Sequence, residues 1–278
     1  MLTSIVGTNW GDEGKGRMVD LLSENYDIVV RYQGGNNAGH TVINEKGKFV
    51  MNLMPSGICR EDTVNILGPG IVIDLEHLYG EVQKLAEKGV EVTPEHLKIS
   101  DRATICMPYH KLMDCLEEDR LLDKKFGSTR RGISPVYADK YMKKAIRMGD
   151  ILLHLEALKE RLGGLVEWKN LTVENGYGHA PVLADEMFQW LKEYGEFFVP
   201  FICDTTEYLG DAIEERKSIL FEAQLGALRD IDFGIYPYTS ASTTLASYAP
   251  IGAGVPFAKL DESIGIMKAY SSCVGEGP

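Results

Sequence analysis

The stretch GTNWGDEGKG at residues 7–16 carries the side chains of this sequence that are best suited to chemistry. Its glycines and its final Gly-Lys are typical of loops whose backbone N–H groups bind phosphate. The standard phosphate-loop pattern has a Ser or Thr after the lysine and a further glycine before the loop, whereas this sequence has Gly16 and Asn9 at those positions. Because a carboxylate among phosphates needs a cation or a proton donor beside it, Asp12 is a candidate magnesium ligand or general base.

The segments that flank this loop favour an anion site. TSIVG at residues 3–7 predicts a buried strand, and GKGRMVDLLSENY at residues 14–26 predicts a helix. A strand, a glycine-rich turn and a helix direct N–H groups and the positive end of the helix at one point. Lys15 would add a positive charge there. A glycine-rich connector with a solvated Asp-Glu pair is the alternative, since short glycine motifs also match by chance.

A second polar loop, QGGNNAGHT at residues 33–41, follows the buried strand predicted for DIVVRY at residues 27–32. Its glycines expose the backbone, its asparagines offer amides, and His40 titrates near neutral pH. A single histidine is more often a hydrogen-bonded structural group, but the end of a glycine-rich loop after a strand favours a functional one. Loops that follow parallel strands gather at one edge of the sheet, so we expect Asp12 and His40 to act as a base and an acid on one substrate.

Basic residues are concentrated in one part of a chain whose formal net charge is −12. KKFGSTRRGISPVY at residues 124–137 predicts a long basic loop. The concentration suggests an anionic ligand, and Ser128 and Thr129 could bind a phosphate monoester. A solvated run of charges is the commoner alternative. The basic residues are Lys124, Lys125, Arg130, Arg131, Lys140, Lys143, Lys144 and Arg147.

Strand patterns alternate with helix patterns along the chain. This alternation predicts an α/β fold with a mostly parallel central sheet flanked by helices and a nucleotide site like that of P-loop NTPases. We expect residues 1–278 to form a single domain. The expected elements are a hairpin at 42–53 with a turn at Lys46-Gly47, strands at 64–73, 97–100, 218–222 and 264–270, a helix at 74–89 with Asp74 as N-cap and Gly89 as stop, a helix at 108–123, and a mostly helical region at 139–216.

Composition excludes several classes of protein. The acidic net charge argues against a general binder of nucleic acid or of anionic membranes. The start of the chain is too short and uncharged for a signal peptide, and no apolar run approaches membrane-spanning length. Five scattered cysteines without a CxxC pair favour reduced thiols in a cytoplasm, and the histidines form no zinc-binding pattern.

Five segments resemble adenylosuccinate synthetase, in the same order as in that family. They are GTNWGDEGKG, RYQGGNNAGHT, GSTRRGISPVYADK, DIDFGIYPYTSAS and KAYSSCVGEGP, and they run from near residue 1 to residue 278. The pairing of WGDEGKG with QGGNNAGHT is highly specific. The resemblance implies a GTP-dependent carbon–nitrogen ligase that makes adenylosuccinate from IMP, GTP and L-aspartate with Mg²⁺ in AMP biosynthesis. It also implies a cytoplasmic homodimer.

The resemblance assigns chemical roles to both loops. It implies that Asp12 takes the N1 proton of the hypoxanthine ring, so that O6 attacks the γ-phosphate of GTP and forms 6-phosphoryl-IMP. The amine of aspartate then displaces that phosphate. His40 corresponds to the acid of the family and would donate a hydrogen bond to the transferring phosphoryl group, and Lys15 would stabilise its charge. Asp12 and the backbone carbonyl of Gly39 would hold Mg²⁺.

The resemblance also implies two overlapping nucleotide sites. Positions that match GTP contacts are Gly11, Asp12, Glu13, Gly14, Lys15, Gly16, Arg17, Gly39, His40 and Thr41. Positions that match IMP contacts are Asp12, Glu13, Gly14, Lys15, Asn37, Ala38, Gly39, His40, Thr129, Lys143, Gln224, Thr239 (Ser240 in another register) and Val274, with Lys143 reaching the IMP of the partner subunit.

Several positions depart from the family pattern. FEAQLG replaces the usual FEGAQG and leaves Gln224 one place out of register, Lys143 replaces an arginine, and Cys273 replaces another. Relatives continue past residue 278, so we expect a chain that lacks the C-terminal part, where the aspartate and guanine contacts belong. The alternative function is therefore an incomplete fragment or nucleotide-binding module that binds IMP or GTP phosphates without turnover. A GTP switch is a weaker alternative, because the first loop lacks the Ser or Thr that binds Mg²⁺.

Overall fold

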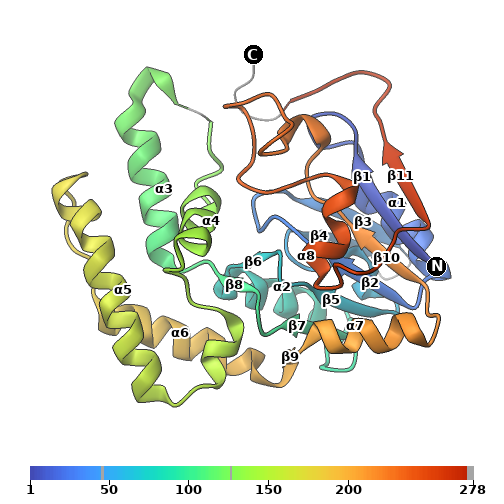
Figure 1. Ribbon diagram of the computed structural model, residues 1–278, viewed down its shortest axis with the longest axis horizontal. Coiled ribbons are helices and arrows are strands. Elements are labelled where there is room, and N and C mark those ends of the chain that lie inside the picture. The colour runs from blue at the N-terminus through green and yellow to red at the C-terminus, as the bar shows by residue number, and fades with distance from the viewer. Residues whose placement is uncertain (45–46, 126, 274–278) are drawn as a thin grey trace.

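The computed structural model describes residues 1–44, 47–125 and 127–273. Across these residues, seven parallel strands form a central sheet in the order β11-β1-β10-β2-β5-β7-β9 (Figure 1). This arrangement confirms the predicted α/β fold with its mostly parallel sheet. The strands of this sheet are β1 Leu2–Gly7, β2 Ile28–Arg31, β5 Val64–Leu67, β7 Leu97–Ser100, β9 Ile202–Cys203, β10 Ile219–Glu222 and β11 Glu262–Ile266. The α-helices are α1 Lys15–Leu22, α2 Leu75–Ala86, α3 Pro108–Leu121, α4 Ile133–Met142, α5 Leu155–Asn175, α6 Ala184–Phe198, α7 Thr205–Glu214 and α8 Ala249–Ala253.

Helices cover both faces of the sheet, and the alternation of side chains along β2 shows how they pack. Ile28 and Val30 belong to a buried cluster with residues of α7 and α8 on one face. Val29 packs on the other face with Val19 of α1. Because both faces are covered, β2 is buried at every position and its sequence lacks the alternation of a half-exposed strand.

A group of helices lies beside the β9 end of the sheet and comprises α3, α4, α5 and α6 (Figure 1). One hydrophobic cluster extends from the sheet into this group. It contains Ile99 of β7, Leu162 of α5 and Phe198 of α6, all of them inaccessible to solvent. Burial of such a side chain stabilises the fold by about 1.5–3 kcal/mol, so this cluster ties the helical group firmly to the sheet.

The second loop leads into an antiparallel hairpin, β3 His40–Asn44 and β4 Gly47–Met51. This element confirms the hairpin predicted at 42–53, although its first strand begins two residues earlier, at His40 itself. The predicted turn residue Lys46 lies outside the described part of the chain. A second small sheet pairs β6 Val72–Ile73 with β8 Thr104–Ile105.

The signals predicted for α2 act as expected. The carboxylate of Asp74 accepts the N–H of His77 at 3.2 Å and caps the helix. At the other end, the N–H of Val90 donates to the carbonyl of Leu85, and Gly89 takes the left-handed conformation with φ +75° that stops the helix.

Three boundaries differ from the predictions, each for a local reason. The strand predicted at 64–73 is divided into β5 and β6 where Gly70 passes so close to β2 that a Cβ atom would lie 2.0 Å from the carbonyl oxygen of Tyr32. The basic loop predicted at 124–137 ends early, because α4 begins after Gly132, whose φ of +76° starts the helix. The strand predicted at 264–270 is β11, displaced towards residue 262, so residues 267–270 leave the sheet.

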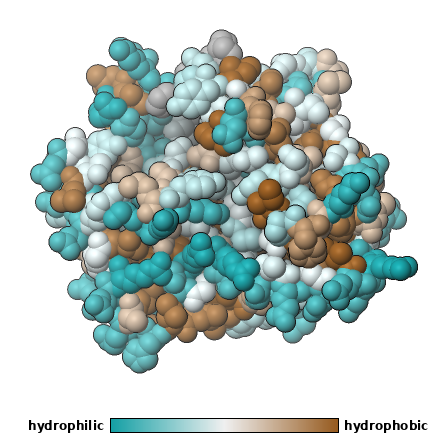
Figure 2. Space-filling view, in the orientation of Figure 1, coloured by the Kyte–Doolittle hydropathy of each residue, from teal (hydrophilic) through white to brown (hydrophobic). Residues whose placement is uncertain are grey.

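No helix in the described residues combines the length and the apolar composition needed to span a membrane. The space-filling view agrees for the face that it displays, where hydrophobic side chains occur in scattered patches among hydrophilic ones (Figure 2). Tyr141 and Met142, at the end of α4, are among the large hydrophobic residues that are exposed.

Candidate functional site

The first loop joins β1 to α1 at the carboxyl-terminal edge of the sheet, and its backbone is unusual. Gly11 and Gly14 have φ values of +101° and +89°, which glycine adopts without cost. Asp12 has φ +60°, a conformation that few other residues take and that often marks a functional position. Its side chain is 68% exposed. The loop therefore presents the Asp12 carboxylate outward.

Glu13, the neighbouring acid, is turned inward. Its carboxylate accepts the N–H groups of Asn9 at 3.1 Å and Gly11 at 2.9 Å, and Lys15 Nζ lies 2.6 Å from it. Burial opposes ionisation of Glu13, but the Lys15 ammonium and the Gly11 N–H outweigh it and hold the pKa of Glu13 below its usual value. Glu13 thus binds its own loop, and it forms a buried ion pair with Lys15 that neutralises the lysine's charge.

Gly16 gives a steric reason for the missing hydroxyl residue of the phosphate-loop pattern. A Cβ atom built there would lie 2.6 Å from Cβ of His40, closer than unbonded carbon atoms approach. The imidazole of the second loop occupies the space that a Ser or Thr side chain would need. The first and second loops are therefore packed directly on one another, as their positions after β1 and β2 predict.

His40 has distinct surroundings at its two ring nitrogens. Nδ1 faces Nη1 of Arg31 at 3.4 Å, and because a guanidinium has only donors, Nδ1 must accept and Nε2 must carry the proton. Nε2 is buried and has no hydrogen-bond partner among the described residues. Burial lowers the pKa of His40 to about 4, with Glu222 opposing and Arg31 adding to the shift. At neutral pH His40 is therefore an uncharged donor, which corrects the expectation that it titrates near neutral pH.

Arg31 and Glu222 are charged residues of the site that the sequence reasoning missed. They are paired across neighbouring strands β2 and β10, their side chains are 1% and 3% exposed, and Nη1 lies 3.8 Å from Oε1. Glu222 also accepts the N–H and hydroxyl of Ser56 at 2.9 and 2.7 Å. The available signal was a charged residue at the last position of an otherwise apolar buried strand.

The two loops and the end of β10 enclose a cavity of about 270 Å³. It brings together most residues predicted for the site, with Arg31 and the β10 end in addition. Gly11, Glu13 and Asn37 are absent from its lining. The lining residues are Asp12, Gly14, Lys15, Gly16, Arg17, Arg31, Ala38, Gly39, His40, Thr41, Glu222, Ala223, Gln224 and Leu225.

Gln224 ties the end of β10 to the second loop, in spite of its shifted register. Its amide donates to the carbonyl of Gly35 at 2.6 Å and to that of Asn52 at 3.2 Å, and it accepts the Gly35 N–H at 3.3 Å. A Cβ atom at Gly34 would lie 2.3 Å from the Gln224 amide oxygen, so only glycine fits there. The amide therefore fixes the backbone of the loop from which His40 extends.

Lys268 is a third residue of the site that the sequence reasoning missed. Its ammonium lies 3.0 Å from Oδ2 of Asp12 and donates to Oγ of Ser272 at 2.6 Å. It follows β11, which pairs with β1, and this pairing brings a segment from the far end of the chain to the first loop. Nothing in the local pattern of IGIMKAY indicates that neighbour.

Other predicted residues do not line this cavity. Thr129 and Lys143 are exposed, and Lys143 has φ +61° at the C-terminal end of α4. Thr239 is half-buried elsewhere, and Val274 lies outside the described residues. The hydroxyl of Ser128 donates to the Asp114 carboxylate at 2.7 Å, so an acid takes the place of the phosphate expected there.

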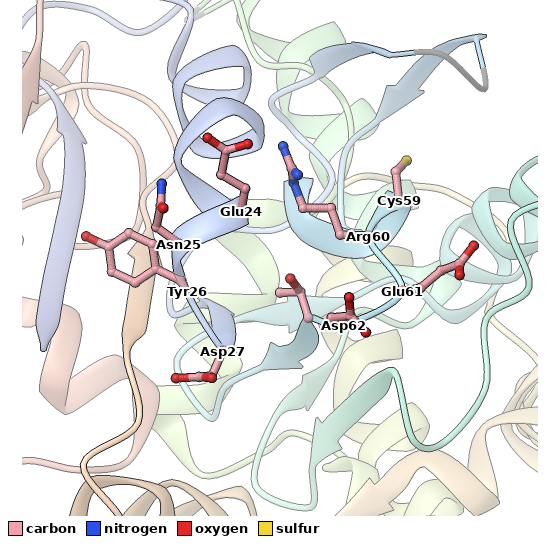
Figure 3. Close-up of a pocket in the computed structure, with 9 residues that line it drawn as sticks. Glu24, Asn25, Tyr26, Asp27, Cys59, Arg60, Glu61 and Asp62 are labelled. Atoms are coloured by element: carbon pink, nitrogen blue, oxygen red, sulfur yellow. The ribbon is translucent and has the colours of Figure 1, made fainter.

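A larger hollow of about 660 Å³ lies at the amino-terminal edge of the sheet, before β2 and β5 (Figure 3). Carboxylates dominate its wall, and Arg60 is the cation among its lining residues; the guanidinium donates to the backbone of α1. It lies away from both glycine-rich loops. Its acidic lining is unsuited to phosphate, so the smaller cavity is the candidate active site. The lining residues are Glu24, Asn25, Tyr26, Asp27, Cys59, Arg60, Glu61, Asp62 and Thr63.

A parallel sheet with glycine-rich loops at its carboxyl edge defines the class of open α/β proteins that bind ligands at that edge. Within this class, residues 4–278 match the family model for adenylosuccinate synthetase, and the chain belongs to that family. It is 43% identical to the adenylosuccinate synthetase of Clostridium botulinum, over 99% of this chain and 64% of that protein. It is 46% identical to adenylosuccinate synthetase 2 of Pseudoalteromonas translucida, over 98% of this chain and 65% of that protein.

Solved structures agree with this assignment. The fully ligated adenylosuccinate synthetase of Plasmodium falciparum superposes with a TM-score of 0.91 at 32% identity and covers all of this chain. The succinoaminodeoxyadenylate synthetase of cyanophage S-2L, at 21% identity and a TM-score of 0.63, shares the fold. The chain spans about 64% of the length of the Clostridium and Plasmodium proteins.

Proposed function

We propose that this chain catalyses the GTP-dependent ligation of L-aspartate to IMP, which gives adenylosuccinate through 6-phosphoryl-IMP in AMP biosynthesis. The observation that carries the proposal is the shared cavity of Asp12, Lys15 and His40, in a chain of the adenylosuccinate synthetase family. An exposed carboxylate, a buried ammonium and an uncharged imidazole donor are the groups that a phosphoryl transfer from GTP to a ring oxygen needs.

The first step divides between Asp12 and His40. The Asp12 carboxylate takes the proton from N1 of the hypoxanthine ring, and the electron pair moves to O6. O6 then forms a bond to the γ-phosphorus while the bond from that phosphorus to the bridging oxygen breaks, and GDP leaves with the electron pair. His40 donates from Nε2 to the phosphoryl group in transfer, because Arg31 faces its other nitrogen.

The second step replaces the new phosphate group by aspartate. The amine nitrogen of aspartate forms a bond to C6, the C6–O6 bond breaks, and inorganic phosphate leaves. The amine loses a proton in the process, and a carboxylate in the cavity is a suitable acceptor. Gln224 supports this chemistry by holding the backbone of the second loop.

The donor set of the cavity fits Mg²⁺. Asp12 offers a carboxylate and Gly39 a backbone carbonyl on the same cavity, and hard oxygen donors of this kind, completed by phosphates and water, are what Mg²⁺ prefers. We infer that these two residues hold the ion. When bound, it would neutralise phosphate charge as in other phosphoryl-transfer sites. In the described residues no group of three or more His, Cys, Asp and Glu side chains is arranged to hold a metal by itself.

The remaining assignments follow from the family and belong to the same proposal. Residues 11–17 and 39–41 bind the phosphates of GTP. When GTP binds, the Lys15 ammonium exchanges its ion pair with Glu13 for one with a phosphate. Asn37, Thr129, Gln224, Thr239 and Val274 contact IMP. Residues 1–278 form one unit in a cytoplasmic homodimer. Exposed Tyr141 and Met142, next to Lys143, support an interface at the end of α4.

The alternative function is a module that binds nucleotide phosphates without turnover. An assay of adenylosuccinate formation, followed by absorbance, decides between the two functions. We expect product only when IMP, GTP, aspartate and Mg²⁺ are all present. Calorimetric binding of IMP or GTP without product formation would favour the binding module. The absence of both binding and product would contradict the proposal.

A further inference from the structure

Lys268 reaches the candidate active site because of the strand order. β11 runs parallel to β1 at the edge of the sheet, with Ile266 opposite Gly7. The carbonyl of Ile266 also accepts the N–H of Thr8 at 3.0 Å, which carries the pairing into the first loop. Lys268 follows directly and lies beside Asp12.

The ammonium of Lys268 has three partners. It lies 3.0 Å from Oδ2 of Asp12, it donates to Oγ of Ser272 at 2.6 Å, and it lies 5.6 Å from the centre of the Tyr270 ring. The lysine side chain is 20% exposed and the Asp12 side chain 68%. The cation is therefore held by its own segment, residues 268–272, and pairs with a carboxylate that stays largely exposed.

This ion pair affects any metal that binds Asp12. The neighbouring acid Glu13 is already occupied by Lys15 and two backbone N–H groups, which leaves Asp12 as the acid that the first loop presents to a ligand. A divalent ion on the Asp12 carboxylate would lie within a few ångströms of the Lys268 ammonium. Like charges at that distance repel each other even in water, and they repel more strongly where the surroundings have a lower dielectric constant.

We propose that Lys268 is a resident counterion of Asp12 that a divalent cation displaces, so that metal binding releases segment 268–272 from the first loop. The inference rests on the proposed role of Asp12 as a metal ligand. Lys268 is a positioning residue. It keeps the Asp12 carboxylate paired before the metal binds, and when the metal displaces it, segment 268–272 loses its contact with the first loop.

A second contact connects this part of the chain to the first loop. Cys273, directly after segment 268–272, contacts the Arg229 guanidinium, which lies 5.0 Å from the Trp10 ring in the first loop. The segment is thus connected to the first loop at both of its ends. A divalent cation that displaces Lys268 would therefore remove one of these two connections to the first loop.

The test measures binding of Mn²⁺, a paramagnetic substitute for Mg²⁺, to the nucleotide-free natural chain by the loss of the free-ion resonance signal. Lys268→Met removes the counterion and should tighten Mn²⁺ binding roughly tenfold. Lys259→Met is the matched control, since it removes the same charge from an exposed lysine before β11, away from Asp12. It should leave Mn²⁺ affinity unchanged, and Lys268→Arg, which retains a cation, should bind like the unsubstituted chain.

Unchanged or weaker Mn²⁺ binding in Lys268→Met would overturn the inference, and weaker binding would make Lys268 part of the ligand site instead. If that variant does not fold, Ser272→Ala loosens the same ammonium and should tighten binding by a smaller factor. Asp12→Asn separates the two proposals. Mn²⁺ binding that survives this change in both backgrounds would contradict the metal-ligand role of Asp12 itself.

Limited proteolysis provides an independent readout. In the unsubstituted chain, Mn²⁺ should accelerate chymotrypsin cleavage after exposed Tyr270, because the segment loses its anchor on Asp12. In Lys268→Met this cleavage should be rapid without metal and respond little to it. Cleavage that slows or stays constant on addition of Mn²⁺ to the unsubstituted chain would show that the metal does not release the segment.

Discussion

Asp12 and Glu13 are adjacent acids with opposite surroundings, and the backbone makes the difference. The positive φ of Asp12 turns its carboxylate outward, whereas Glu13 accepts N–H groups inside the loop and binds Lys15. The sequence predicted an acid with a role of its own in this loop. It assigned the second acid, Glu13, to nucleotide contacts and did not predict its inward turn, because that turn depends on Gly11 and on the space beside Gly226, where a Cβ atom would lie 2.6 Å from Oε1 of Glu13.

His40→Asn tests the imidazole as a donor to the transferring group. We expect kcat to fall about 10²–10⁴-fold with little change in KM for IMP, because the partner of Nε2 develops charge only during transfer. Steady-state kinetics of adenylosuccinate formation measure both constants. A raised KM with kcat retained would instead identify His40 as a binding residue.

Gly16→Ser tests the packing of the two loops by restoring the hydroxyl of the phosphate-loop pattern. The new Cβ would meet His40 at 2.6 Å, so we expect a loss of about 1–3 kcal/mol in the free energy of unfolding, measured in urea, and impaired turnover. Gly80→Ser is the matched control in α2, where a Cβ atom meets nothing within 4 Å, and it should be neutral. A stable and fully active Gly16→Ser would contradict the steric account.

At the scale of elements, local patterns predicted the strands better than their neighbours. DIVVRY and SILFE are buried apolar runs, and they form β2 and β10. The partners of β1 are another matter: Leu2 lies opposite Ile219, and Thr3 lies opposite Glu262. Parallel neighbours are joined by long crossovers whose sequence says little about the pairing. The two loops were predicted to meet because loops after parallel strands gather at one edge of the sheet. Glu222 and Lys268 were not predicted to join them, because their place there depends on which strands are neighbours.

The packing of α3, α4 and α5 predicts a dependence of stability on pH. His110 on α3 contacts Asp139 on α4 at 2.8 Å, and Lys169 on α5 pairs with the same buried carboxylate. Burial lowers the pKa of His110, although Asp139 opposes the shift. The unfolded chain therefore takes up the proton first as pH falls. This contribution is complete above about pH 6.5 and is lost below it, by up to about 1.4 kcal/mol per pH unit.

Urea unfolding between pH 8 and pH 5 measures this slope. His40, whose pKa is also lowered, contributes with the same sign, so the natural chain should lose stability steadily below pH 6.5. His110→Gln removes one titrating group and should flatten the curve. An equal slope in His110→Gln would show that His110 does not set the pH dependence.

At the scale of the whole molecule, the proposed homodimer makes a prediction about Lys143. The residue is not part of the lining of its own cavity and follows exposed apolar side chains at the end of α4, as expected for a group that serves a partner. Mixing equal amounts of Lys143→Ala and Asp12→Asn chains should restore about a quarter of wild-type activity. About half of the dimers are then mixed, and each mixed dimer has one site with both defects and one intact site. No rescue would rule out a role in the partner subunit.

The central claim is that the cavity between the first and second loops transfers the γ-phosphoryl group of GTP to O6 of IMP, with Asp12 as base. Positional isotope exchange measures this step alone: GTP carries ¹⁸O in its β–γ bridge, IMP and Mg²⁺ are present, and aspartate is omitted. The account predicts IMP-dependent movement of the label to non-bridging positions on the β-phosphate, slowed about 10²–10⁴-fold in Asp12→Asn. Absence of exchange in the natural chain, or equal exchange in Asp12→Asn, would contradict it.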